Sequence, residues 1–178
     1  MVAPNERNIK MIIKLSPRDI SMCKQGANLR WQIARASGVG NQKRDLTRED
    51  SDLDFLGLKA ELSVAKILGI EHNLFQLGID DGADLWYGDI SIDVKATFHK
   101  NGRLLFKSKQ SFRSNCAILV CQENEEEMNV VGYIPRKVFL SDCYEKDLGH
   151  GVGFMMDQSN LRPLSNLWEV YVKRKFGQ

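Results

Sequence analysis

Several features that define special classes of protein are scarce in this chain of 178 residues. It has four prolines and four cysteines, and 43% of its residues are hydrophobic while 27% are charged. These fractions exclude a disordered chain, a collagen-like chain and a disulfide-dense scaffold. No apolar run approaches the ~18 residues of a membrane-spanning helix, and residues 1–14 lack the apolar region of a secretory signal. We therefore expect a cytoplasmic protein with no membrane partner.

The spacing of the cysteines argues against a metal or disulfide framework. Cys116 and Cys121 lie five residues apart in one apolar run, where a strand would point them to opposite faces. Cys23 and Cys143 are distant in the sequence, and there is no CxxC pair. Zinc and iron–sulfur sites are commonly built on such pairs, so we expect four reduced thiols.

The small net charge of +2 conceals an uneven distribution along the chain. Residues 1–48 carry a net +7, residues 49–93 a net −9, residues 94–113 a net +6 and residues 114–178 a net −2. An acidic block between two basic blocks is more informative than the total. It is either ordinary surface patterning, or carboxylates gathered for a metal ion beside cations gathered for a polyanion.

Two helices are predicted in the first 70 residues. The first begins at Ser16-Pro17 and ends before Gly38, with apolar residues every three or four positions. The second spans about residues 51–69 and is apolar around most of its circumference. Only one strip of this second helix is expected to face water, formed by Lys59, Ser63 and Lys66.

The chain then changes to the alternation of a β-sheet. Residues 83–87 and 89–98 flank Gly88 and predict a hairpin, whose second strand has apolar even positions and polar odd positions. Further predicted elements are a short strand at 103–106, a short helix at 107–114, a buried strand at 116–121 and a strand at 129–134. The segment 168–172 fits a strand or a helix.

Three acidic residues and one lysine stand out within these elements. Glu61 falls in the apolar arc of its helix, where a carboxylate is costly unless it is paired or bound to a cation. Asp84 opens the first hairpin strand, and Asp93 and Lys95 project from one face of the second. Each has an ordinary explanation when taken alone. Glu61 would pair with a base at a helix edge, Asp84 would accept from turn amides, and Asp93 and Lys95 would lie on a solvated strand face.

Taken together, the order and spacing of these four residues resemble the PD-(D/E)XK nuclease superfamily, which has the restriction-endonuclease-like fold. The segment 93–106 is similar to the second and third core strands of archaeal Holliday-junction resolvases, and the likeness covers about residues 51–135. Two departures are Ala83, where a proline usually precedes the first aspartate, and an unusually short helix before Cys116.

The resemblance implies an α/β fold with a restriction-endonuclease-like core, in which a central mixed β-sheet is flanked by helices. This core domain would comprise residues 51–178, and residues 1–50 would form a basic helical N-terminal extension. The four residues Glu61, Asp84, Asp93 and Lys95 would be the catalytic residues of a Mg²⁺-dependent DNA endonuclease, a deoxyribonuclease that hydrolyses phosphodiester bonds and leaves 5′-phosphates. A homodimer is expected by analogy with relatives that cut both strands.

The resemblance also assigns ligands to the metal ion. Glu61, Asp84, Asp93 and the backbone carbonyl of Val94 would hold Mg²⁺, for which Mn²⁺ would substitute. An oxygen-rich set suits Mg²⁺, which prefers hard ligands and keeps several waters.

The basic block that begins at Lys95 is the expected DNA contact. Its cations would neutralise backbone phosphates and make binding depend on salt, whereas the ordinary alternative is a solvated basic turn. The predicted DNA-binding residues are Lys100, Arg103, Lys107, Lys109, Gln110 and Arg113. Trp86 and Tyr87, beside the hairpin turn, either stack on bases or pack as core or turn aromatics.

Two other functions stay open. An exonuclease would degrade DNA from its ends, and a non-catalytic DNA-binding module would keep the fold without cleavage. The presence of all four motif residues argues against the module.

Overall fold

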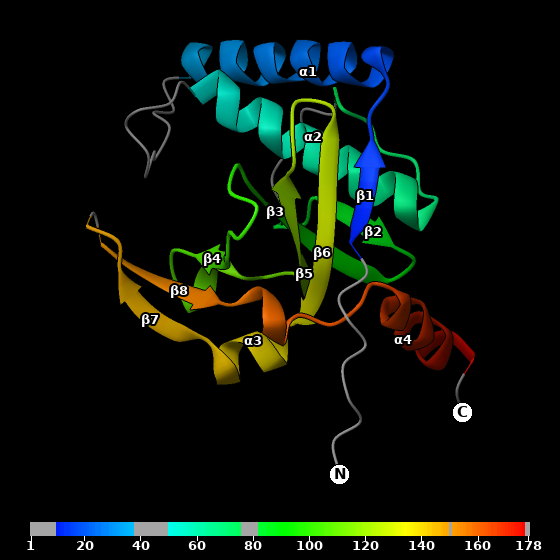
Figure 1. Ribbon diagram of the computed structural model, residues 1–178, viewed down its shortest axis with the longest axis vertical. Helices are drawn as coiled ribbons and strands as arrows, with labels where there is room; N and C mark the ends of the chain where they lie inside the picture. The colour runs from blue at the N-terminus through cyan, green and yellow to red at the C-terminus, as the bar shows by residue number, and fades with distance from the viewer. Residues whose placement is uncertain (1–9, 38–49, 76–81, 150, 177–178) are drawn as a thin grey trace.

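The computed structural model describes residues 10–37, 50–75, 82–149 and 151–176. Within these ranges the chain is an α/β structure in which two β-sheets are flanked by helices (Figure 1). The strands are β1 (Met11–Lys14), β2 (Leu85–Tyr87), β3 (Ile90–Thr97), β4 (Leu104–Phe106), β5 (Cys116–Gln122), β6 (Glu127–Pro135), β7 (Tyr144–Asp147) and β8 (Val152–Met156). The helices are α1 (Pro17–Ala36), α2 (Asp50–Leu68), α3 (Arg136–Asp142) and α4 (Ser165–Phe176), with short 3₁₀ turns η1 (Lys109–Ser111) and η2 (Gln158–Asn160).

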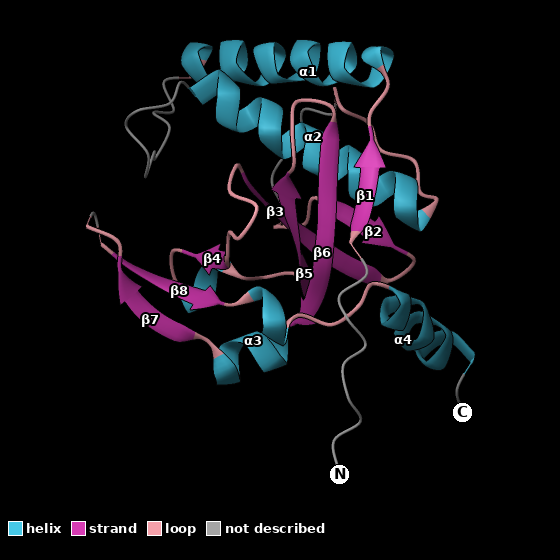
Figure 2. Ribbon diagram, in the orientation of Figure 1, coloured by secondary structure: helices cyan, strands magenta, loops and turns pink. Residues whose placement is uncertain are grey.

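Five strands form a mixed sheet in the order β1-β6-β5-β3-β2 (Figure 2). Strands β3 and β5 are parallel, and all other neighbours in this sheet are antiparallel. Strand β2 pairs only with Ile90–Ile92 of the eight-residue β3. The second half of β3, from Val94 onward, therefore extends past the edge strand. This arrangement confirms the prediction of a mixed sheet flanked by helices.

A separate hydrophobic core covers each face of the five-stranded sheet. On one face, α2 and α4 pack against the even-numbered residues of β3, Ile90, Ile92 and Val94. On the other, β4, β8 and α3 pack against Ala117 and Leu119 of β5. In the parallel pairing of β3 with β5, these two residues lie opposite Asp93 and Lys95. The odd-numbered residues of β3 therefore point toward the second core.

The N-terminal segment packs against the rest of the chain. Strand β1, which the sequence did not predict, pairs with β6 at an edge of the large sheet. Helix α1 begins with a capping box between Ser16 and Asp19, and its buried residues Cys23 and Ala27 contact Leu58 of α2. Figure 1 shows α1 lying across the outer side of α2. The domain boundary at residue 50 stays a prediction.

Two sequence predictions after the hairpin are wrong in part. The strand predicted at 103–106 exists as β4, but it pairs with β8 in a second sheet of order β4-β8-β7, so it is not a third strand of the main sheet. The helix predicted at 107–114 is reduced to the 3₁₀ turn η1. Phe112, directly after that turn, is fully buried and stacks on Phe106. This packing shapes the segment more strongly than helix propensity does.

The prediction that Lys59, Ser63 and Lys66 of α2 form a strip facing water is also wrong. Lys59 is 3% exposed and Ser63 is fully buried, and only Lys66 faces water. Lys59 donates to Gln122 Oε1 (2.7 Å) and to the carbonyl of Glu125 (3.1 Å), while Ser63 donates to the carbonyl of Lys59. Lys59 therefore lies where α2 meets the β5–β6 turn, and burial lowers the pKa of Lys59.

Other predictions are confirmed, and one hairpin was missed. Both long helices, the β2–β3 hairpin, the buried strand β5 and the strand β6 lie where the sequence patterns put them. The undecided segment 168–172 belongs to helix α4. Hairpin β7–β8 was not predicted. The four cysteines are free, and in the described part of the chain no helix has the length and apolar character needed to cross a membrane.

Candidate active site

Asp84 lies where β2 begins, beside the part of β3 that extends past the edge strand. Its backbone amide donates to the carbonyl of Ile92 (2.9 Å), which continues the β2–β3 pairing. Its carboxylate then accepts from the amide of Val94 (2.6 Å). Because the carbonyl and amide of one residue in an antiparallel pair point the same way, the Val94 carbonyl also faces this edge.

Asp93 and Lys95 project together from the face of β3 that meets the second core. Asp93 is 7% exposed, and the Lys95 ammonium lies 2.6 Å from its Oδ1. The same ammonium lies 4.8 Å from the centre of the Phe106 ring on β4. The second sheet thus holds Lys95 beside the aspartate, as the two-residue spacing on one strand predicted.

Glu61 approaches from the opposite face, on α2. It is 6% exposed, and its carboxylate accepts from both terminal nitrogens of Arg30 (3.4 and 3.3 Å). His72 Nε2 lies 2.8 Å from Glu61 Oε2. Glu61 is thus paired with basic side chains of the chain, which is the ordinary explanation for a carboxylate in this arc.

Arg30 and His72 were not predicted as partners of Glu61. Arg30 is one of several basic residues on α1, and His72 belongs to no motif of the sequence. The buried position of Glu61 was the only available signal that two such partners should exist, and it did not say which residues they are.

The carboxylates are close enough to alter one another's charge. Burial, followed by the negative charges of Glu61 and Asp93, raises the pKa of Asp84 to about 7. The Val94 amide and Lys95 act in the opposite direction. Asp84 still keeps solvent-exposed surface, because it lies at a sheet edge between two packed faces. Water therefore reaches this carboxylate, and burial raises its pKa less than it would raise the pKa of an enclosed group.

The donor set fits a divalent ion that uses few protein ligands. Among the residues that the structure describes, no three His, Cys, Asp or Glu side chains are grouped closely enough to hold a metal ion by themselves. Mg²⁺ is usually bound by one or two carboxylates and otherwise by water and substrate phosphates. Asp84, Asp93 and the Val94 carbonyl provide such a set, with Glu61 behind it and already paired.

The predicted DNA-binding residues lie around the second sheet and the loops beside it. Lys100 pairs with Glu123 (3.3 Å) and Arg103 with Asp157 (2.5 Å), while Lys109 is half-buried and donates to the carbonyl of Leu140. A DNA phosphate could bind Lys100, Arg103 or Lys109 only by replacing these contacts. Lys107 and Gln110 are exposed, and the exposed Arg113 packs its side chain against Gly82, two residues before Asp84.

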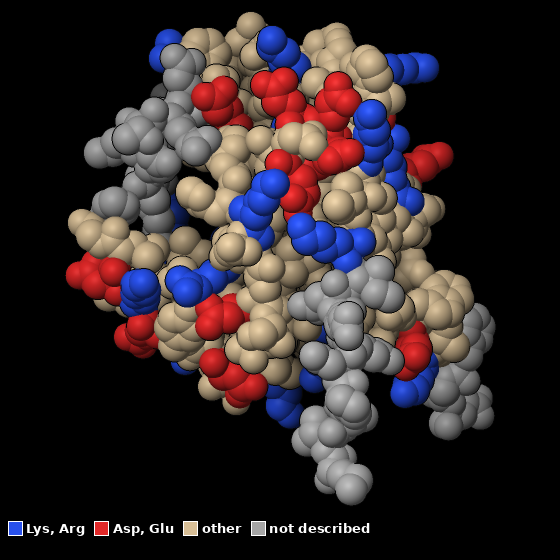
Figure 3. Space-filling model, viewed as in Figure 1, with Lys and Arg blue, Asp and Glu red and all other residues tan. Residues whose placement is uncertain are grey.

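Acidic and basic side chains also meet at the β5–β6 turn. Glu123 in this turn pairs with Lys10 (3.1 Å) as well as with Lys100. Figure 3 shows acidic side chains gathered below α1, with basic side chains at their border. The glutamates at 125 and 126 of this turn are exposed.

Comparisons with protein families, with curated proteins and with solved structures give no match to this chain. The relation to the nuclease superfamily therefore stays a resemblance based on the four motif residues and on the fold class.

Proposed function

We propose that this protein is a Mg²⁺-dependent deoxyribonuclease with a restriction-endonuclease-like core, which hydrolyses phosphodiester bonds within DNA strands. The observation that carries the proposal is the convergence at the edge of β3. Asp84 accepts from Val94, Asp93 pairs with Lys95, and the charge of Glu61 acts on Asp84 from the opposite face. A single structural ion pair would need one carboxylate, whereas here the charges of Glu61 and Asp93 both act on Asp84.

In this proposal each residue has a distinct part. Asp84, Asp93 and the Val94 carbonyl would hold the metal ion, and when bound the ion would lower the pKa of its water and offset charge on the phosphate. Lys95 neutralises Asp93 in the free protein and would orient the attacking water and contact the phosphate. Glu61, fixed by Arg30 and His72, would act through water or directly on the same centre.

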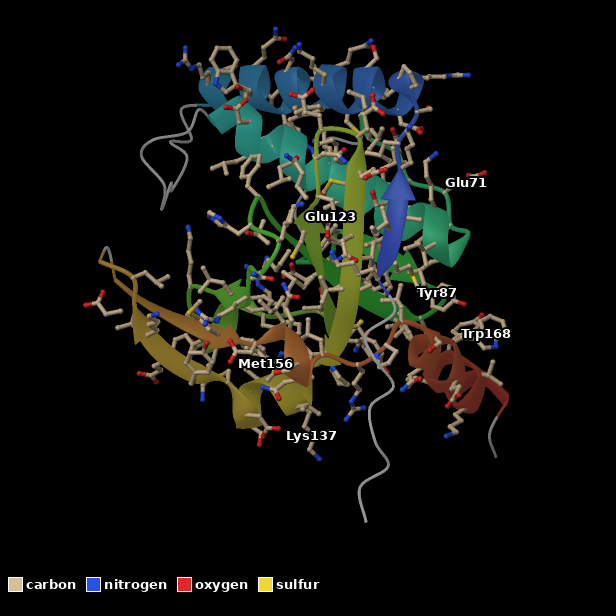
Figure 4. All side chains as sticks on the ribbon, in the orientation of Figure 1. Glu71, Tyr87, Glu123, Lys137, Met156 and Trp168 are labelled. Atoms are coloured by element: carbon tan, nitrogen blue, oxygen red, sulfur yellow. The ribbon has the colours of Figure 1, made fainter. Side chains whose placement is uncertain are left out.

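Cleavage of a supercoiled plasmid in Mg²⁺ tests the proposal. Wild-type protein should nick or linearise the plasmid, and Asp93→Asn and Lys95→Ala should each lose at least about 100-fold in rate, since an electrostatic contact at the reacting centre is worth that much. Asp142→Asn and Lys137→Ala are matched controls on α3, where Lys137 lies at the far end of the molecule (Figure 4). Cleavage that persists in Asp93→Asn would overturn the site, whatever its metal dependence.

The same assay separates an exonuclease from an endonuclease. A covalently closed circle has no ends, so an exonuclease would leave it intact while degrading the linear form. Loss of only the linear substrate would therefore replace the endonuclease with the exonuclease.

One observation favours a non-catalytic DNA-binding module as the second candidate. Asp93 and Glu61 are already paired with Lys95, Arg30 and His72, so the acidic residues are neutralised without a metal ion. DNA binding that is unaffected by Mg²⁺ or Mn²⁺, with no cleavage in either, would select the module.

A further inference from the structure

Trp86 lies on the same face of the sheet as Asp93 and Lys95, two of the candidate catalytic residues. It pairs with Ser91 in the β2–β3 register, and directly paired residues of antiparallel strands point to the same side. Asp93 is two residues further along β3, so its side chain is the diagonal neighbour of Trp86 on that side. Asp84, two residues before Trp86 in the chain, adjoins the same region.

Trp86 is also one of the most exposed large hydrophobic residues described. Its exposed fraction is 52%, whereas its neighbour Leu85 is 3% exposed. An exposed tryptophan needs no explanation by itself. Its place next to Asp84, and on the same face as Asp93 and Lys95, does, because an aromatic ring adds nothing to metal binding or to the charge of the site.

The other side of the same hairpin is fixed by aromatic packing. The ring of Tyr87 lies 5.0 Å from that of Tyr171 and 6.3 Å from that of Trp168, both on α4. Figure 4 shows Tyr87 and Trp168 next to each other between β2 and α4. Gly88 has a φ of 61°, and a side chain there would run into Tyr171. The hairpin thus presents Trp86 from an anchored position.

We propose that Trp86 stacks on a base of the substrate, and that the site accepts nucleic acid in which a base beside the cut is unpaired. This inference rests on the proposed function. In an intact duplex both faces of a base are covered by its neighbours, so a side chain must pay to unstack them, and stacking on an unpaired or displaced base costs less. Lys95 on the same face and Arg113 beside Gly82 supply charge for the phosphates that flank such a base.

Binding of a fluorescent single-stranded oligonucleotide and of its duplex tests this proposal. Affinities are measured by anisotropy in Ca²⁺, and a denaturing gel shows that the DNA stays intact. Trp86→Ala should weaken single-strand binding by about tenfold, an ordinary effect of losing one stacked base, and duplex binding by less than twofold. Trp86→Phe, which keeps a ring, should retain most of the affinity.

Phe75→Ala is the matched control, because Phe75 is 39% exposed but lies in the loop after α2, next to Leu74, which packs with α1. It should alter neither affinity, and thermal melting of each variant shows that the fold is kept. Equal losses for both DNA forms in Trp86→Ala, or no loss for either, would overturn the proposal, as would an equal effect of Phe75→Ala. The failure of the proposed function is a separate result, namely the absence of cleavage in Mg²⁺, and it leaves these affinities measurable.

Discussion

At the scale of single residues, the carboxylates of the candidate site differ in how they are neutralised. Glu61 and Asp93 have basic partners within the chain, whereas Asp84 accepts from a backbone amide and faces two acids. This arrangement makes the charge on Asp84 sensitive to pH and to an added cation.

The stability of the protein should reveal the raised pKa of Asp84. Burial and like charges raise this pKa from 3.8 to about 7, so the folded state binds the proton more tightly than the unfolded state. The stabilisation of the folded state by this bound proton is fully present below about pH 4 and is lost as the pH rises through 7. Wild type should therefore lose stability between pH 5 and pH 8 relative to Asp84→Asn, as measured by urea unfolding. Parallel curves for the two proteins would contradict this prediction.

The partners of Glu61 should matter for stability as well as for any activity. His72→Ala leaves a buried carboxylate with one partner fewer, so we expect a loss of about 1–3 kcal/mol in the free energy of unfolding. Glu61→Gln in the same background should recover part of it, because the charge is removed. His99→Ala is the control, since His99 is exposed and should change stability by less than about 0.5 kcal/mol. Equal losses for the two histidines would refute the special role of His72.

At the scale of elements, periodic segments could be predicted from the sequence and long-range pairings could not. Helices α1 and α2 and the β2–β3 hairpin follow from local repeats and turn signals. Strand β7 is exposed at all four positions, so it has no apolar alternation to detect. The transfer of β4 to a second sheet depends on β8, about 50 residues later, and no local pattern carries that information.

The same limit applies to the candidate site. The shared face of Asp93 and Lys95 could be predicted because both lie on β3, whose faces alternate, whereas the resemblance alone singled out Asp84, which directly precedes β2. The partners of Glu61 come from α1 and from the loop after α2, and their meeting depends on how α1 crosses α2. The burial of Lys59 depends in the same way on the β5–β6 turn.

Helix packing gives a test with opposite signs at two glycines. A methyl group at Gly26 of α1 would lie 2.7 Å from the carbonyl oxygen of Leu74, while one at Gly57 of α2 meets nothing within 4 Å. Alanine is favoured over glycine in a helix by about 1 kcal/mol. Gly57→Ala should therefore stabilise the protein, whereas Gly26→Ala should destabilise it because α1 must move away from Leu74. Thermal melting of both variants measures these two changes in stability, and changes of the same sign would contradict the prediction.

At the scale of the whole molecule, the acidic block and the basic block that follows it meet on β3. The acidic block supplies Glu61, Asp84 and Asp93, and the basic block begins at Lys95, which pairs with Asp93. A net charge of +2 is thus the sum of unlike segments of the chain. Near-neutrality of the total therefore gives little argument against a polyanionic substrate.

DNA binding should require a divalent cation and weaken with salt. Without the cation, the carboxylates repel the phosphates that Lys100, Lys107 and Arg113 would attract. We expect affinity to rise when Mg²⁺ is added at pH 8 and to rise less at pH 5.5, where a proton on Asp84 competes with the metal ion. Asp93→Asn should bind DNA more tightly than wild type in EDTA, as measured by anisotropy across a salt series. A wild-type affinity that is the same in EDTA and in Mg²⁺ would rule out this account.

The candidate site also depends on the packing of both faces of the sheet, because Asp84 lies at the edge between them. Glu61 belongs to the core beneath α2, whereas Asp93 and Lys95 belong to the face covered by the second sheet. The three carboxylates are therefore neighbours only while both cores are packed at once. Loss of packing on either face of the sheet would separate them. On warming, the proposed metal-dependent cleavage should be lost at or below the temperature at which the helices unfold.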